Sequence, residues 1–154
     1  MPRGRYRPDK DDFAPWWNAW SLMWNTNSTN PKLIYPIQVV YDYMISHIAD
    51  YVKPTPGVNI LRVENMSAIE QSPRQHRYHI HSKLVILSTG LLDLDYDKMK
   101  AFMEKQLRQV KGFKSIAFYH TILAGYNNER NYEEYLKKNP IIARKGKSKF
   151  NLLP

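Results

Sequence analysis

Two histidines separated by one apolar residue, His79-Ile80-His81, stand near the start of a strand-like stretch that runs to Leu87. In a β-strand the side chains of residues i and i+2 leave the same face of the sheet. His79 and His81 are therefore expected to point the same way and to share one metal ion or one phosphate group. On its own, a pair of this kind is more often structural than functional.

Glu70 offers a third ligand, because it lies nine residues before His79, on the other arm of a predicted hairpin. Two imidazoles and one carboxylate suit Mn²⁺ or Mg²⁺ with coordination positions left open. An open position is what a catalytic metal needs to polarise a phosphate oxygen. Glu64 is a competing carboxylate, and Glu70 could instead cap a turn. His76, in the turn itself, is expected to be exposed to solvent rather than to bind the metal.

Tyr135 and Lys138 form a Tyr-x-x-Lys pattern on a predicted helix, and Tyr132 lies one turn earlier near the same face. A tyrosine hydroxyl can attack a phosphodiester when its developing charge is stabilised and the phosphate is polarised. A neighbouring lysine and a bound metal would meet these two needs. The chain contains 11 tyrosines, so the pattern by itself is weak.

A third candidate region is Trp24-Asn25-Thr26-Asn27, at the end of an aromatic stretch. Exposed aromatic rings beside amide side chains can stack on single-stranded bases and bind them. Most of the four tryptophans are expected in the core.

The composition indicates one folded domain with a polyanionic partner. The chain has 154 residues, of which 43% are hydrophobic and 13% aromatic, and it carries a formal net charge of +9. That charge favours nucleic acid over an anionic membrane surface. The chain has no cysteine, which excludes disulfides, thiolate metal sites and a cysteine nucleophile. It also lacks the glycine-rich phosphate loop of ATPases and helicases, and it shows neither a membrane span nor a signal peptide.

The predicted elements alternate in the order β-α-β-β-α-β, followed by a short helix. We predict a basic flexible arm over 1–12, a folded domain over 13–140 and a basic tail over 141–154. Within the domain the predicted strands span 19–24, 58–63 with an extension to 69, 77–87 and 113–123, and the predicted helices span 30–48, 96–110 and 129–138. This order is that of the ferredoxin-like, split β-α-β sandwich, an α+β fold with helices packed on an antiparallel sheet.

The three motifs and their order resemble the HUH endonuclease domain of rolling-circle replication initiator (Rep) proteins of single-stranded DNA viruses and plasmids. The first motif of that family resembles the stretch 20–27, which differs by its aromatic residues. The second resembles His79-Ile80-His81 with Glu70 on the preceding strand, and the third resembles Tyr135-Leu136-Lys137-Lys138. The likeness covers about residues 16–140.

The resemblance implies an enzyme that nicks and rejoins single-stranded origin DNA through a 5′-phosphotyrosine link. Tyr135 would be the nucleophile, with Tyr132 as the alternative, and Lys138 would orient the phosphate or the tyrosine. Glu70, His79 and His81 would hold Mn²⁺ or Mg²⁺. The enzyme would act inside the cell, in the host nucleus or in the cytoplasm, with a helicase supplied by the host or by another chain. The alternative is a non-catalytic single-stranded nucleic-acid-binding protein on the same fold, with structural histidines.

Overall fold

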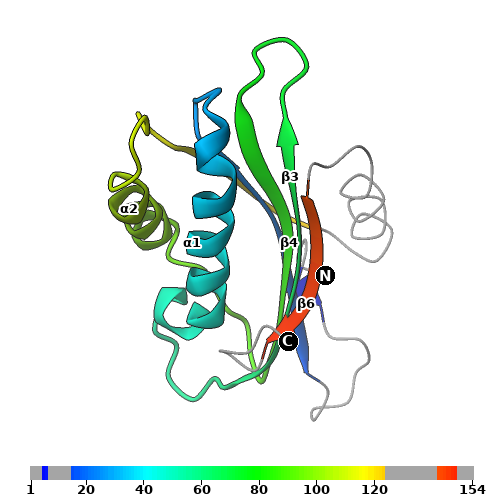
Figure 1. Ribbon diagram of the computed structural model, residues 1–154. Coiled ribbons are helices and arrows are strands. Elements are labelled where there is room, and N and C mark those ends of the chain that lie inside the picture. The colour runs from blue at the N-terminus through cyan, green and yellow to red at the C-terminus, as the bar shows by residue number, and fades with distance from the viewer. Residues whose placement is uncertain (1–4, 7–14, 124–141, 149–154) are drawn as a thin grey trace.

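The computed structural model describes residues 5–6, 15–123 and 142–148 (Figure 1). The elements of these parts follow one another as β1 (Arg5–Tyr6), β2 (Trp16–Asn25), the 3₁₀ turn η1 (Pro31–Leu33), α1 (Ile34–Ser46), the 3₁₀ turn η2 (Ile48–Tyr51), β3 (Ile60–Gln71), β4 (Tyr78–Ser88), α2 (Tyr96–Leu107), β5 (Ala117–Ile122) and β6 (Ile142–Ser148). Among them, no helix combines the length and the apolar character that crossing a bilayer requires.

The strands form one antiparallel sheet in the spatial order β5-β2-β4-β3-β6, and β1 pairs with the first part of β2. β4 lies between β2 and β3 and is antiparallel to both, so β2 and β3 run in the same direction with one strand between them. This arrangement is the split β-α-β unit, and it confirms the predicted α+β, ferredoxin-like sandwich.

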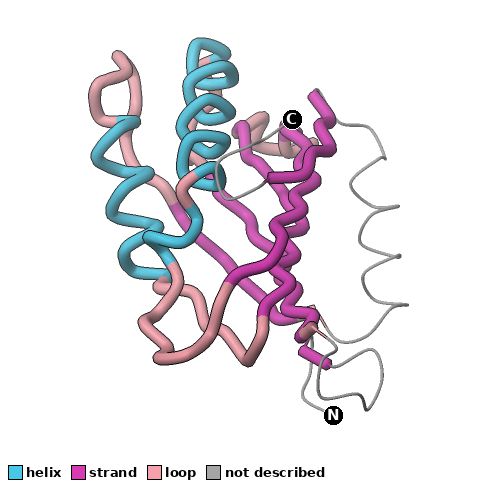
Figure 2. The backbone as a smooth tube through the Cα atoms, turned by 90° about the horizontal axis from the view of Figure 1, so that it is seen from below, coloured by secondary structure: helices cyan, strands magenta, loops and turns pink. Residues whose placement is uncertain are grey.

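Both helices pack on one face of the sheet, as Figures 1 and 2 show. Apolar residues alternate along the strands, so that every second side chain enters the core between sheet and helices. The core residues of the two layers include Trp20, Leu22, Trp24, Ile80, Leu84 and Ile86 from the sheet and Ile37, Tyr41, Met44, Met99, Met103 and Leu107 from the helices. We call the face of the sheet that points away from α1 and α2 the distal face.

The helix starts follow their local sequence. The Asn30 side chain accepts a hydrogen bond from the Lys32 amide, and Pro31 occupies the first position of η1. The first turn is 3₁₀ rather than α, and α1 ends at Ser46, before the predicted end near Ile48. The Asp95 side chain caps α2 by accepting from the Lys98 amide.

The two predicted terminal segments both contain strands. The arm predicted over 1–12 contributes the two-residue strand β1, and the tail predicted over 141–154 contains β6. β6 pairs with β3 from Ile69–Ile142 to Val63–Ser148 and so provides hydrogen bonds to the outer edge of β3. A tail is predicted here because residues 142–148 are rich in basic side chains, and composition alone does not reveal that they form a strand. The helix predicted over 129–138 lies outside the described residues.

Candidate metal centre on the distal face

Glu70, His79 and His81 lie on the two paired strands of the β3–β4 hairpin. Glu70 stands directly opposite His79, and Ala68 stands opposite His81. Their neighbours Ile69 and Ile80 face the helices and are fully buried, so alternation directs the three polar side chains to the distal face. A register shift of one residue would move Glu70 to the helix face, so the apolar pattern of the hairpin is what sets the site.

The three side chains converge on one point. The Glu70 Oε2 atom lies 3.3 Å from His79 Nε2 and 3.6 Å from His81 Nε2. The two imidazole rings meet edge to face, with centroids 4.7 Å apart. One ligand atom from each residue lies within 4.8 Å of the others, and the side chains are 12–15% exposed. This cluster can hold a metal ion, and its two nitrogens and one oxygen leave further coordination positions for other ligands.

Burial and, to a lesser extent, the neighbouring His79 together lower the pKa of His81 from its ordinary 6.5 to about 4. His81 is therefore a neutral imidazole at neutral pH. A neutral imidazole has a free ring nitrogen to offer a cation, so the protonation state of His81 suits the role of a ligand.

The competing residues do not join the cluster. Glu64 lies on the same face of β3 but six residues before Glu70, about 20 Å along the strand, and it forms an ion pair with Arg62. His76 lies in the hairpin turn, is exposed, and is not part of the ligand group found among the described residues. Both outcomes agree with the sequence-based choice of Glu70 over Glu64 and with the expected exposure of His76.

A buried polar contact fixes α1 to the strands that carry the ligands. The Tyr41 hydroxyl lies 2.7 Å from Asn65 Oδ1 on β3 and 2.6 Å from Ser82 Oγ on β4. Because the hydroxyl has one proton, it donates to the Asn65 amide oxygen and accepts from the Ser82 hydroxyl. Ser82 follows His81 directly, so the helix side of β4 is fixed next to the cluster.

The predicted DNA-binding stretch divides into buried and half-buried residues. Trp24 is fully buried on the helix face, where its ring stacks on Phe118 with centroids 3.6 Å apart. Thr26 is also buried and donates its hydroxyl to the Tyr78 carbonyl. The assignment of Trp24 and Thr26 as DNA contacts is therefore wrong, because strand alternation and the turn geometry direct both side chains into the protein.

Asn25 and Asn27 remain half-buried. Asn25 pairs across the strands with His79 and thus lies in the same cross-strand row as the ligands. Its Oδ1 accepts from the Asn27 amide, and Asn27 adopts a left-handed conformation with φ 55. Of the predicted stretch, Asn25 is thus the residue that pairs directly with a member of the cluster, whereas the Asn27 side-chain amide donates to Ser115 Oγ ahead of β5.

Tyr132, Tyr135 and Lys138 lie outside the described residues. Sequence reasoning also left out two residues of interest. Arg77 precedes His79 by two residues, and Tyr119 on β5 is 58% exposed in the cross-strand row that contains Met23 and His81. Strand alternation counted back from His79 could have identified Arg77, whereas the place of Tyr119 depends on the pairing of β5 with β2.

Comparisons of the chain with models of protein families, with curated proteins and with solved structures found no match.

Proposed function

We propose that this protein is a metal-dependent endonuclease of the HUH type that nicks and rejoins single-stranded origin DNA, as the initiators of rolling-circle replication do. One observation carries the proposal: Glu70, His79 and His81 converge on the distal face of a ferredoxin-like sheet, within 4.8 Å of one another. The likeness of the Tyr-x-x-Lys motif at 135–138 and the net charge of +9 support it.

The ligand residues and the metal would act on the scissile phosphate. Glu70, His79 and His81 would hold Mn²⁺ or Mg²⁺, and the ion supplies polarisation of a phosphate oxygen when it is bound. The half-buried setting strengthens the electrostatic contacts of these side chains compared with contacts in bulk water. Asn25, in the same row as His79 and Glu70, would border the site on the β2 side.

Tyr135 would be the nucleophile. Its phenolic oxygen would form a bond to the phosphorus and lose its proton to solvent, while the bond to the 3′ oxygen breaks and that oxygen takes up a proton. The products would be a 5′-phosphotyrosine link and a free 3′ hydroxyl. Attack by that hydroxyl, or by another 3′ hydroxyl, on the phosphotyrosine would rejoin a strand. Lys138 would orient the phosphate or the tyrosine, and Tyr132 is the alternative nucleophile.

The reaction has consequences for partners and place of action. A nick exposes a 3′ end for a polymerase, and a helicase from the host or from another chain would unwind the duplex. The protein would act inside the cell, in the nucleus of a eukaryotic host or in the cytoplasm of a bacterial one.

Covalent trapping tests the proposal. The full chain is incubated with Mn²⁺ and a panel of labelled single-stranded hairpin oligonucleotides, and the products are separated under denaturing conditions. A protein–DNA adduct is expected that disappears with Tyr135→Phe and with EDTA and persists with Tyr132→Phe. Loss of the adduct in Tyr132→Phe but not in Tyr135→Phe would identify Tyr132 as the nucleophile.

The pair Glu70→Gln and Glu64→Gln supplies the matched control for the metal. Both variants remove one carboxylate from the same face of β3, but only Glu70 belongs to the cluster. Adduct formation is expected to fall in Glu70→Gln alone. Absence of any adduct across the panel, with DNA binding retained, would favour the non-catalytic single-strand binding protein over the nuclease.

A further inference from the structure

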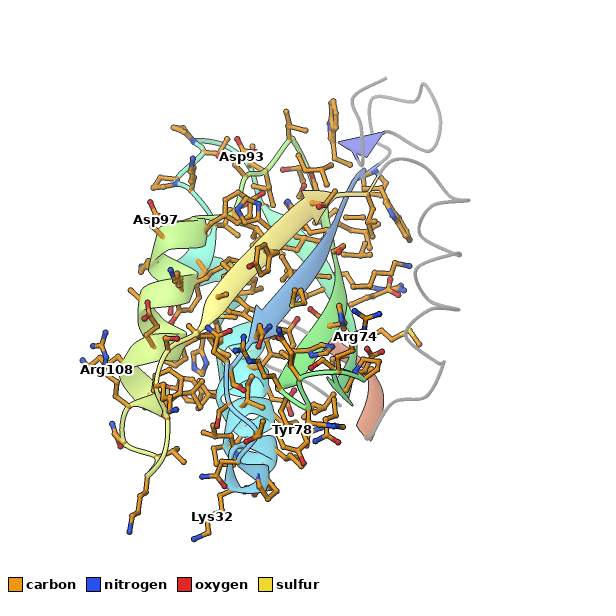
Figure 3. The ribbon with its side chains drawn as sticks, turned by 90° about the horizontal axis from the view of Figure 1, so that it is seen from above. Lys32, Arg74, Tyr78, Asp93, Asp97 and Arg108 are labelled. Atoms are coloured by element: carbon orange, nitrogen blue, oxygen red, sulfur yellow. The ribbon has the colours of Figure 1, made fainter. Side chains whose placement is uncertain are left out.

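The turn that joins β3 and β4 carries two arginines, Arg74 and Arg77. Arg74 is exposed and Arg77 half-buried, and within the described residues neither forms an ion pair. Figure 3 shows Arg74 at the hairpin end, on the opposite side of the molecule from Arg108, which follows the last residue of α2. Two guanidinium groups without an ion-pair partner among the described residues thus lie on the turn between the strands that carry Glu70, His79 and His81.

Hydrogen bonds hold this turn in one shape. The Ser72 amide donates to the Arg77 carbonyl at 2.9 Å, and the Arg77 amide donates to Ser72 Oγ at 3.0 Å. The His76 amide donates to the Ser72 carbonyl, and the Gln71 side-chain amide donates to the His76 carbonyl at 3.1 Å. These bonds keep His76 in a left-handed conformation, with φ 55, that few non-glycine residues adopt. The turn is therefore organised before any ligand binds.

Strand alternation places Arg77 in line with the histidines. The bond from Ser72 to Arg77 continues the β3–β4 ladder one step beyond the last pair, Gln71 with Tyr78. Residues 77, 79 and 81 then share the distal face, each about 7 Å from the next along the strand. Arg77 therefore lies one such step from the cluster that can hold a metal ion. When one phosphate of a polyanion is at the metal, the positively charged Arg77 side chain is in position to bind the next phosphate of the same molecule.

We infer that the turn 72–77 is a phosphate-binding element for single-stranded DNA, in which Arg77 binds the backbone phosphate next to the one at the metal cluster and Arg74 binds a phosphate farther along. This inference rests on the proposed function for the class of ligand. The arginines position the strand and take no part in bond breaking. Arg77 has the planar fork that binds two phosphate oxygens at once, whereas a lysine would act as a point charge.

The salt dependence of DNA binding tests the inference. Binding of a fluorescent single-stranded oligonucleotide to the full chain is measured in EDTA over a range of salt concentrations. Each phosphate contact adds about 0.7 to the magnitude of the slope of log affinity against log salt, so Arg74→Gln/Arg77→Gln is expected to reduce it by about 1.4. Arg77→Lys is expected to keep the slope and to lower the affinity.

A matched control removes the same charge from the other side of the protein. Lys100 and Lys105 are exposed on α2, and Lys100→Gln/Lys105→Gln is expected to leave the slope unchanged. An unchanged slope in the arginine variant, or an equal change in both variants, overturns the inference. If the double arginine variant unfolds, Arg74→Gln alone, at the exposed tip, must reduce the slope by about 0.7.

The outcome separates this inference from the nuclease. A reduced slope without any covalent adduct in Mn²⁺ keeps the phosphate-binding turn and rejects the nuclease. A covalent adduct together with an unchanged slope keeps the nuclease and rejects the phosphate-binding turn. Failure of the wild-type chain to bind single-stranded DNA rejects both.

Discussion

Glu70 and His79 face each other directly across the β3–β4 pair, with Oε2 3.3 Å from Nε2. The contact joins residues nine positions apart through a single cross-strand step, and His81 completes the group from the next position on the same face. The geometry thus depends on the hairpin register, which the apolar residues buried against the helices set. A site built in this way on paired strands is held firmly before a metal binds.

Substitution of a ligand residue is expected to weaken metal binding strongly. His79→Ala and His81→Ala each remove a ligand nitrogen, and Glu70→Gln replaces an anionic ligand oxygen with a neutral amide oxygen. Each should lower Mn²⁺ affinity by more than the roughly 10- to 100-fold that loss of a group supporting a ligand costs. Isothermal titration calorimetry measures the affinity. Glu64→Gln is the control and should bind like the wild type, because Glu64 pairs with Arg62 and stands apart from the cluster. Equal affinity in all four variants would show that the ion binds elsewhere.

The metal-free protein is expected to lose stability in mild acid because of His81. Its pKa is about 4 in the folded protein and about 6.5 when unfolded, so between these values the unfolded chain binds more protons. The contribution of neutral His81 to the free energy of unfolding is fully present above pH 6.5 and is lost as the pH falls to about 4. The total loss is on the order of 3 kcal/mol. Urea unfolding in EDTA at pH 7, 5.5 and 4 measures it.

His81→Gln is the matched variant for this pH dependence, since it keeps a polar side chain but does not titrate in the range. Its free energy of unfolding should fall less than that of the wild type between pH 7 and pH 4. Parallel curves for the two proteins would show that His81 is readily protonated in the fold, and its role as a neutral ligand would lose its basis.

The hairpin shows how far sequence can predict such a site. Alternation of apolar residues predicted that His79 and His81 share a face, and the turn between the strands predicted that Glu70 folds back beside them. Both inferences use only local periodicity, and the distances of 3.3 and 3.6 Å confirm them. The order of strands and helices likewise predicted the ferredoxin-like sheet.

Predictions failed where partners distant in sequence decide the structure. The basic stretch at 142–148 forms β6 because the outer edge of β3 offers hydrogen bonds, which composition does not reveal. Thr26 has the side chain of a surface turn residue, but its hydroxyl is bound to the carbonyl of Tyr78, 52 positions away. Neither pairing leaves a periodic signal in the chain.

Removal of the Tyr41 hydroxyl is expected to destabilise the protein. Tyr41→Phe leaves the buried Asn65 and Ser82 groups without their shared partner, which costs about 1–3 kcal/mol. Tyr43→Phe, on the same helix but 56% exposed, should change the free energy of unfolding little. Urea denaturation compares the two variants. Similar losses in both would mean that the hydroxyl of Tyr41 contributes nothing beyond what an exposed tyrosine does.

Trp24 offers a direct test of whether the first motif contacts DNA or forms the core. Its ring is fully buried and stacked on Phe118, and its indole N–H has no hydrogen-bond partner among the described residues. Trp24→Ala should therefore destabilise the fold by about 3–5 kcal/mol. Trp24→Phe should cost less, because it retains an aromatic ring and removes the unsatisfied donor.

The readout that separates the two roles of Trp24 is binding of single-stranded DNA by the folded Trp24→Phe variant. A core role predicts a lower unfolding midpoint with unchanged affinity, since no base can reach the buried ring. Asn25→Ala supplies the comparison, because Asn25 is half-buried in the row of His79 and Glu70, and its loss should weaken binding without the same loss of stability. Weaker binding by Trp24→Phe than by Asn25→Ala would require β2 to open when DNA binds, against the stacking of Trp24 on Phe118.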